Sequence, residues 1–219
     1  MRGITAGAAR EIAATWVAAK GFQTPGVAGA FLHGSINWLP DDAELPATSD
    51  LDVMLVLAGE APAQKPGKLR YQGVLLEVSY LSLAEVANAE LVLGNAHLAG
   101  SFHRPSVLAD PSGHLTALQR EVANHYADDV WVLRRCAEIE AKMRLPFPPP
   151  NAPFADQVNA WLFPTGLTTH LLLVAGLRNP TVRRRYEAVR DLLAECGRPD
   201  IYAGLLEDLD VANMTPQLA

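Results

Sequence analysis

The spacing of apolar residues changes near Gly113, and this change limits the folds that the chain can adopt. Before Gly113, short apolar runs are separated by glycine, proline and polar residues, which is the pattern of β-strands joined by turns. After Gly113, apolar residues recur every three or four positions over longer segments, which is typical of amphipathic helices. We therefore expect an α+β protein with two domains. Residues 1–113 would form a mixed β-sheet flanked by helices, and residues 114–219 an all-α helical bundle.

The expected elements follow from apolar spacing and from turn residues. Strands are expected over four segments: 27–33, 51–57, 70–81 and 106–109. A first helix is expected over residues 4–20, and the capping box of Ser82 and Glu85 predicts a second one that runs to about Leu93. Later helices are expected over four segments: 115–145, 154–177, 181–196 and 201–209.

The composition is that of a globular protein, and its acidic balance fits a small ligand better than a long nucleic acid. Hydrophobic residues make up 49% of the chain and charged residues 19%, which is enough apolar surface for a real core. The net charge of −6 argues against binding to long nucleic acids, because such proteins neutralise phosphates with a basic face. Cys136 and Cys196 show neither a C-x-x-C pattern nor the spacing of a zinc site.

The apolar segments do not predict a secreted or membrane-bound protein. Arg10 and Glu11 interrupt the N-terminal segment, which therefore lacks the apolar stretch of a secretory signal. The most apolar segment, residues 160–177, contains Pro164 and His170 and is too interrupted for a membrane span. We therefore expect a cytoplasmic protein with no membrane partner, and the sequence leaves the oligomeric state open.

Two carboxylates lie two positions apart at the start of the second expected strand. Side chains alternate across a strand, so Asp50 and Asp52 point to the same face, roughly 7 Å apart at the backbone. Two like charges on one face are costly unless a cation lies between them, and Mg²⁺ favours a few carboxylates together with substrate phosphates. An Asp-x-Asp pair alone is a weak signal, because it also occurs at the solvated edge of a strand.

Gly34 and Ser35 follow the first expected strand directly. A glycine lets the backbone approach a phosphate closely, and backbone N–H groups together with the Ser35 hydroxyl can bind phosphate oxygens. The alternative is an ordinary turn without a ligand.

Glu77 is an acid within an otherwise apolar strand. A lone buried carboxylate is costly, so this side chain needs a partner or a task. If its strand lies beside that of Asp50, Glu77 can face the same cleft as the Asp pair. The alternative is a structural ion pair with Arg70 or Lys68.

Together these residues resemble the nucleotidyltransferase superfamily that includes DNA polymerase beta. The similarity covers residues 29–81, and the size and helical second half are most similar to the aminoglycoside (streptomycin and spectinomycin) adenylyltransferases. The resemblance implies a nucleotidyltransferase-type sheet in which Gly34 and Ser35 hold the triphosphate. It also implies that Asp50 and Asp52 ligate two Mg²⁺ ions, and that Glu77 is a third ligand or the general base.

The activity that this resemblance implies is transfer of a nucleoside monophosphate, AMP from ATP, to a hydroxyl group of a small acceptor. An aminoglycoside-type antibiotic is the expected acceptor class, which would make antibiotic resistance the biological role. The hydroxyl would attack the α-phosphorus in line, and two metal ions would stabilise the attacking and leaving oxygens. Ser49, Arg183 and Arg184 are further expected nucleotide contacts; for the arginines, the alternative is a solvated helix face.

Other functions stay open at this point. One alternative is a non-catalytic nucleotide-binding or antitoxin-like regulatory protein of the same fold, and another is a protein-modifying adenylyltransferase. The presence of all three carboxylates beside the Gly-Ser pair favours catalysis. The sequence decides neither the acceptor nor which nucleoside triphosphate is used.

Overall fold

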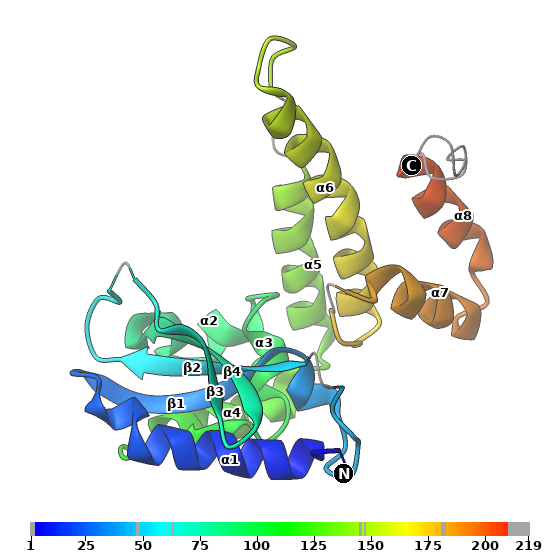
Figure 1. Cartoon of the computed structure of the whole chain (residues 1–219). Helices are drawn as coiled ribbons and strands as arrows, with labels where there is room; N and C mark the ends of the chain where they lie inside the picture. The colour runs from blue at the N-terminus through cyan, green and yellow to red at the C-terminus, as the bar shows by residue number, and fades with distance from the viewer. Residues whose placement is uncertain are drawn as a thin grey trace. The chain divides into compact units, whose positions relative to one another are not determined.

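The chain is a mixed α/β protein, as the sequence predicts. The computed structural model describes residues 3–46, 49–62, 64–144, 146, 148–180 and 183–209. These residues form a five-stranded mixed sheet and eight α-helices (Figure 1). The chain divides into two compact units, residues 1–128 and 129–219.

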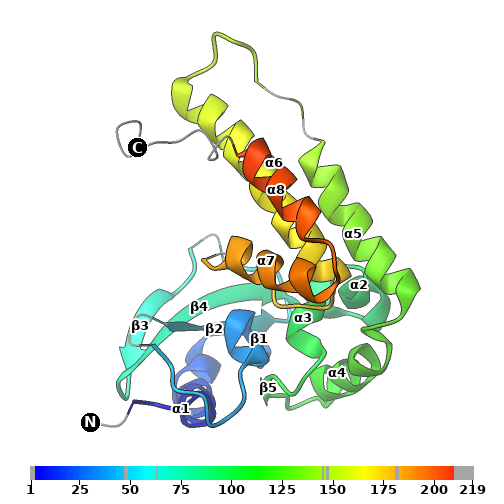
Figure 2. The ribbon, with the colours of Figure 1, turned by 90° about the vertical axis from the view of Figure 1, so that its right-hand side faces the viewer.

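The sheet belongs to the first unit, and its strand order is β3-β4-β2-β1-β5. The strands are β1 (Val27–His33), β2 (Asp50–Leu57), β3 (Gly67–Tyr71), β4 (Val74–Ser82) and β5 (Val107–Ala109). β2 pairs with β4 in parallel, whereas the other neighbouring strands are antiparallel. Figure 2 shows β3 and β5 at opposite edges, with β2 and β1 inside the sheet.

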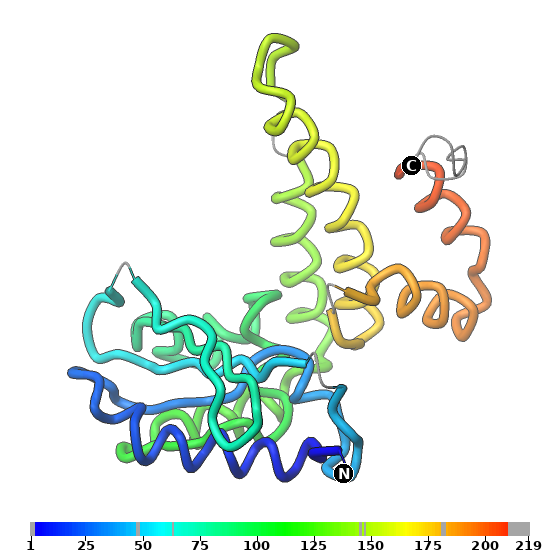
Figure 3. Tube along the Cα trace, in the orientation of Figure 1, coloured from blue at the N-terminus to red at the C-terminus, as the bar shows by residue number. Residues whose placement is uncertain are grey.

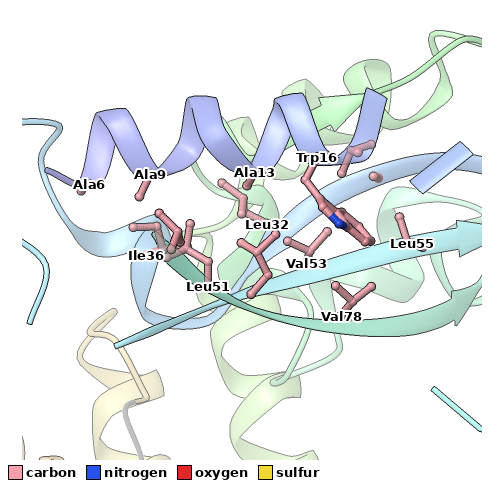
Figure 4. Packing of buried hydrophobic residues seen from close by; sticks show 14 residues of the cluster. Ala6, Ala9, Ala13, Trp16, Leu32, Ile36, Leu51, Val53, Leu55 and Val78 are labelled. Carbon is pink, nitrogen blue, oxygen red and sulfur yellow. The ribbon is translucent and has the colours of Figure 1, made fainter. Parts of the chain in front are cut away.

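Helix α1 (Ala6–Ala19) covers one face of the sheet. Its buried residues Ala6, Ala9, Ala13 and Trp16 recur every three or four positions, so they form a single stripe. Figure 4 shows this stripe against the apolar side chains of β1, β2 and β4. The alternate residues of β2 that point to this face, Leu51, Val53 and Leu55, are buried. Asp50 and Asp52 therefore point to the opposite face.

Short helices pack on that opposite face of the same unit. They are η3 (Leu83–Val86), α2 (Ala89–Leu93), α3 (Ala99–Phe102) and α4 (His114–His125), with η denoting a 3₁₀ helix. The Phe31 ring of β1 lies 4.6 Å from the Phe102 ring of α3, measured between centroids. The capping box of Ser82 and Glu85 is confirmed, but it opens η3, and Asn88 then caps α2 separately. The single helix expected up to Leu93 is therefore wrong.

The single strand expected over residues 70–81 is also wrong, because two strands share this segment. Gln72 and Gly73 form a two-residue turn between β3 and β4, with φ angles of 46° and 84°. Positive φ at both positions is the conformation of a type I′ hairpin turn. The turn pairs Tyr71 with Val74, and the same register sets Lys68 opposite Glu77.

The regular elements among the described residues of the second unit are all helices. They are α5 (Asp129–Met143), α6 (Phe154–Ala175), α7 (Arg185–Glu195) and α8 (Pro199–Asp208), and α5 runs beside α6 (Figure 3). A small core joins α6, α7 and α8 through five buried side chains: Leu173, Val189, Leu192, Leu193 and Leu205. The expected helix start at Thr181 and the residues after Leu209 lie outside the described residues.

The boundary between the two compact units falls after Asp128 in the chain, whereas the sequence places it at Gly113. The helix expected over residues 115–145 is in fact two helices, α4 and α5, separated at residues 126–128. α4 contacts α2 and α3, so it belongs with the sheet. Within the described residues, α6 alone is long and apolar enough to cross a membrane by length and composition, and one such helix is a weak indication.

Candidate functional site

Four polar side chains form a row across the sheet, on the face opposite α1. The strand registers pair His33 with Asp52, Asp52 with Glu77, and Lys68 with Glu77. Side chains of directly paired residues share a face, so the row crosses β1, β2, β4 and β3. Asp50 lies two residues before Asp52 and points the same way. The structure thus brings all three predicted carboxylates to one face.

The surroundings of Asp52 disfavour a negative charge on its side chain. Burial, followed by the neighbouring charges of Asp50 and Glu77, raises the pKa of Asp52 from 3.8 to about 6. The charges of Lys68 and Lys65 lower this pKa, but by less than burial and the two carboxylates raise it. A further positive charge would lower it more, because it would stabilise the carboxylate. The electrostatics of the row therefore favour a bound cation.

Two lysines bind the other two carboxylates. The Lys68 ammonium group donates a hydrogen bond to Asp50, and its Nζ lies 3.2 Å from Glu77 Oε2. Lys65 Nζ donates to Glu77 Oε1 at 2.8 Å. Hydrogen bonds from Lys65 and then from Lys68 hold the pKa of Glu77 below its usual value.

The ion pair between Glu77 and Lys68 was one of the alternatives that the sequence allowed, and it is present. Lys65 was missed by the sequence reasoning. The position of Lys68 could have been predicted from the hairpin turn. If Gln72 and Gly73 are the two turn residues, Tyr71 pairs with Val74, and the same register pairs Lys68 with Glu77. Lys65 precedes β3 in a loop, and no strand register predicts its position.

Gly34 lies against Asp52, one of the three carboxylates (Asp50, Asp52 and Glu77) that form the acidic row. Its φ is 74°, in the left-handed region that favours glycine, and a Cβ at this position would collide with Asp52 Oδ2. Gly34 and Ser35 begin the 3₁₀ helix η2 (Gly34–Trp38), in which Ser35 is exposed. The Gly-Ser turn thus lies against the carboxylate of Asp52.

Arg10 holds the segment that follows this turn. Its Nη2 donates to the carbonyl oxygens of Ile36 and Leu39, each at 2.6 Å, and its Nη1 pairs with Asp41. The buried Asn37 adds a hydrogen bond from Nδ2 to the Leu32 carbonyl oxygen at 2.7 Å. These contacts fix the backbone on both sides of η2, which positions the turn relative to the sheet.

His33 closes the row on the β1 side. Its Nδ1 forms a hydrogen bond of 2.6 Å with Ser101 Oγ, and its ring centroid lies 4.3 Å from that of His97. Burial, followed by the charge of His97, lowers the pKa of His33 from 6.5 to about 4. His33 is therefore neutral near pH 7.

The remaining predicted residues fall into two groups. Ser49 immediately precedes β2, and its backbone N–H donates to the Pro46 carbonyl oxygen at 2.8 Å. Arg183 and Arg184 belong to the second unit and are not among the residues that the sheet brings together. Arg184 forms two hydrogen bonds with Glu187, at 2.7 and 2.8 Å, as expected for a solvated helix face.

The donor set fits a hard divalent cation. Asp50, Asp52 and Glu77 offer only carboxylate oxygens, which are the ligands that Mg²⁺ prefers. In the part of the chain that the structure describes, no group of three or more His, Cys, Asp or Glu side chains is arranged to hold a metal ion. The three carboxylates nevertheless share one face of the sheet, and a divalent cation bound there would reduce their mutual repulsion.

Comparison with known proteins adds no assignment. No protein-family model matches the sequence. No curated protein matches it significantly. Function is therefore inferred from the site itself.

Proposed function

We propose that this protein is a Mg²⁺-dependent nucleotidyltransferase that moves AMP from ATP to a hydroxyl group of a small acceptor. The observation that carries the proposal is the contact of Gly34 with Asp52, within a row that also contains Glu77. A turn that can bind phosphate and a set of carboxylates that can bind a cation thus meet at one point. Metal-bound triphosphates need both features together.

Each residue of the site has a role in this proposal. Asp50, Asp52 and Glu77 would hold Mg²⁺, which neutralises triphosphate charge when bound. The backbone of Gly34 and Ser35 would hold phosphate oxygens. Arg10 keeps this turn in position through its bonds to the following backbone.

The proposed reaction is a balanced transfer. The acceptor oxygen forms a bond to the α-phosphorus, and the bond from that phosphorus to the bridging oxygen breaks, so pyrophosphate leaves with the electron pair. The proton of the acceptor hydroxyl passes to a carboxylate of the row. Glu77 is the candidate for this role, as an alternative to its role as a metal ligand, because it pairs with Asp52 on the face where the phosphates would bind.

The proposal extends to the rest of the molecule. The sheet would be of the nucleotidyltransferase type. An aminoglycoside-type antibiotic is the proposed acceptor class, and the proposed location is the cytoplasm.

The test is pyrophosphate release from ATP in the presence of Mg²⁺ and a panel of aminoglycosides. We expect release with at least one acceptor, and loss of release in the variants Asp50→Asn and Asp52→Asn. Glu60→Gln is the control, because Glu60 is an exposed acid in the loop after β2. Equal rates in the wild type and in both aspartate variants would contradict the proposal.

One observation favours a second candidate, a regulatory protein that binds nucleotides without catalysis. Lys65 and Lys68 already balance charge on Asp50 and Glu77, as a structural ion-pair cluster would. Tight nucleotide binding without pyrophosphate release on any small molecule or protein would support this candidate. Transfer of labelled AMP to a protein would instead identify a protein-modifying enzyme.

A further inference from the structure

We propose that Lys68 is an exchangeable counter-ion of the acidic row. Its ammonium group would leave Asp50 and Glu77 when a divalent cation binds there, and would then bind the phosphates of the nucleotide. This inference rests on the proposed function, because it assumes that these carboxylates ligate a metal.

The position of Lys68 is set by the sheet. Its Cα pairs with that of Glu77 across β3 and β4, so its backbone stays next to the row. Its side chain is about half exposed and reaches two carboxylates on two different strands, Asp50 of β2 and Glu77 of β4. A lysine side chain has four flexible carbon–carbon bonds, so the ammonium group can move while the backbone stays fixed.

The contacts of Lys68 imply competition with a metal. A carboxylate oxygen that accepts a hydrogen bond from an ammonium group donates less readily to a cation, and the two positive groups repel each other. Lys68 engages two of the three proposed ligands at once, whereas Lys65 engages only Glu77. Within the described residues, no hydrogen bond from either lysine reaches Asp52. Lys68 should therefore weaken metal binding more than Lys65 does.

The same geometry gives the displaced ammonium group a new partner. Asp52 contacts the Gly34 turn, and Glu77, beside Asp52, faces Lys68. Phosphates held at that turn would lie next to the row, within the range of a flexible lysine. Lys68 should therefore oppose the metal alone but favour the nucleotide, and these two effects have opposite signs.

The first experiment measures Mn²⁺ binding to the full chain by electron paramagnetic resonance. We expect Lys68→Met to bind Mn²⁺ about two- to five-fold more tightly than the wild type, because exposed ion pairs have energies of this order. Lys65→Met should show a smaller gain. Lys142→Met is the matched control, because the Lys142 side chain is 49% exposed, against 50% for Lys68, and pairs with Glu138.

The second experiment measures binding of the α,β-methylene analogue of ATP at saturating Mn²⁺. We expect Lys68→Met to bind this analogue roughly ten-fold more weakly than the wild type, because a hydrogen bond to a charged group is lost. Lys68→Arg should restore binding, because it keeps the charge. A purely structural role for Lys68 would not move the two affinities in opposite directions.

The outcomes separate this inference from the proposed function. Equal Mn²⁺ affinity in the wild type and Lys68→Met would overturn the inference and leave the metal site intact. Failure of both to bind Mn²⁺ would overturn the proposed function, and the inference with it. If Lys68→Met does not fold, as seen by circular dichroism, Lys68→Gln replaces it, and unchanged Mn²⁺ affinity in that variant overturns the inference.

Discussion

Gly34 meets two independent constraints at a single residue. Its φ of 74° disfavours any side chain, and its neighbour Asp52 fills the space that a Cβ would need. We expect Gly34→Ala to lower the free energy of unfolding by about 1–3 kcal/mol and pyrophosphate release by about 100-fold, because the turn must move. Urea denaturation and the release assay measure the two effects.

Gly26 offers the matched control for this substitution. Its φ is 81°, but no atom of the described residues lies within 4 Å of the position of a Cβ. Gly26→Ala should therefore destabilise the fold through the backbone alone and leave pyrophosphate release unchanged. If the two variants lose activity equally, the collision with Asp52 has no functional meaning.

The pH dependence of stability should reveal Asp52 and His33 as opposing groups. The pKa of Asp52 is raised to about 6, so the folded state holds this proton more tightly and stability falls as pH rises from about 4 to 6. The pKa of His33 is lowered to about 4, so the unfolded state takes up this proton first and stability rises between about pH 4 and 6.5. The His33 contribution is about 3 kcal/mol, and that of Asp52 is smaller because solvent screens it.

Asp52→Asn separates these two contributions. Without the carboxylate, only the His33 contribution remains, so the free energy of unfolding should rise more steeply from pH 4 to 6.5 than in the wild type. Urea denaturation at several pH values in a chelator such as EDTA measures the slope. A slope equal to that of the wild type would show that Asp52 keeps its ordinary pKa.

At the scale of single residues, local sequence predicts the acids and the glycine better than their cationic partners. Asp50, Asp52 and Gly34 stand in short patterns whose geometry follows from a strand or a turn. Lys65 lies 12 positions from Glu77, and their contact depends on the conformation of the loop that contains Lys65, before β3. Local spacing contains no information about that loop conformation.

At the scale of elements, the hairpin between β3 and β4 shows where apolar patterns fail. The strands are separated by only two residues, and Gln72 lacks the preference for positive φ that Asn or Gly has at this position. The apolar pattern therefore predicts one long strand over residues 70–81. In contrast, the strand over residues 27–33 is predicted at its observed bounds, because Gly26 and Gly34 flank it.

The same turn allows a prediction about stability. Gln72 has a φ of 46°, which asparagine tolerates better than glutamine. We expect Gln72→Asn to raise the free energy of unfolding by about 0.5–1 kcal/mol, and Gly73→Ala to lower it by about 1 kcal/mol. Urea denaturation measures both. A loss of stability in Gln72→Asn would mean that the glutamine side chain has a structural role.

At the scale of the whole molecule, helix packing determines the boundary between the two compact units, and the change in the apolar pattern of the sequence does not predict it. The pattern changes at Gly113, where strands end, but α4 completes the core of the first unit and shifts the boundary to Asp128. Helical periodicity predicts that the residues of α4 are helical, but neither where α4 ends nor which core it joins. This choice depends on contacts with α2 and α3, which are distant in sequence.

This division predicts that residues 1–128 fold by themselves. The fragment contains the complete sheet, α1 and the acidic row, so we expect a cooperative thermal transition and Mn²⁺ affinity within about two-fold of the full chain. Calorimetry and Mn²⁺ titration provide the readouts, and a fragment that stays unfolded would contradict the division.

The most direct measurement of the central claim is anomalous diffraction from crystals grown with Mn²⁺ and the α,β-methylene analogue of ATP. The account predicts Mn²⁺ bound by Asp50, Asp52 and Glu77, with the phosphates against Gly34 and Ser35 and with Lys68 turned away from its carboxylates. Mn²⁺ that binds elsewhere, or a nucleotide whose phosphates lie away from Gly34, would contradict it.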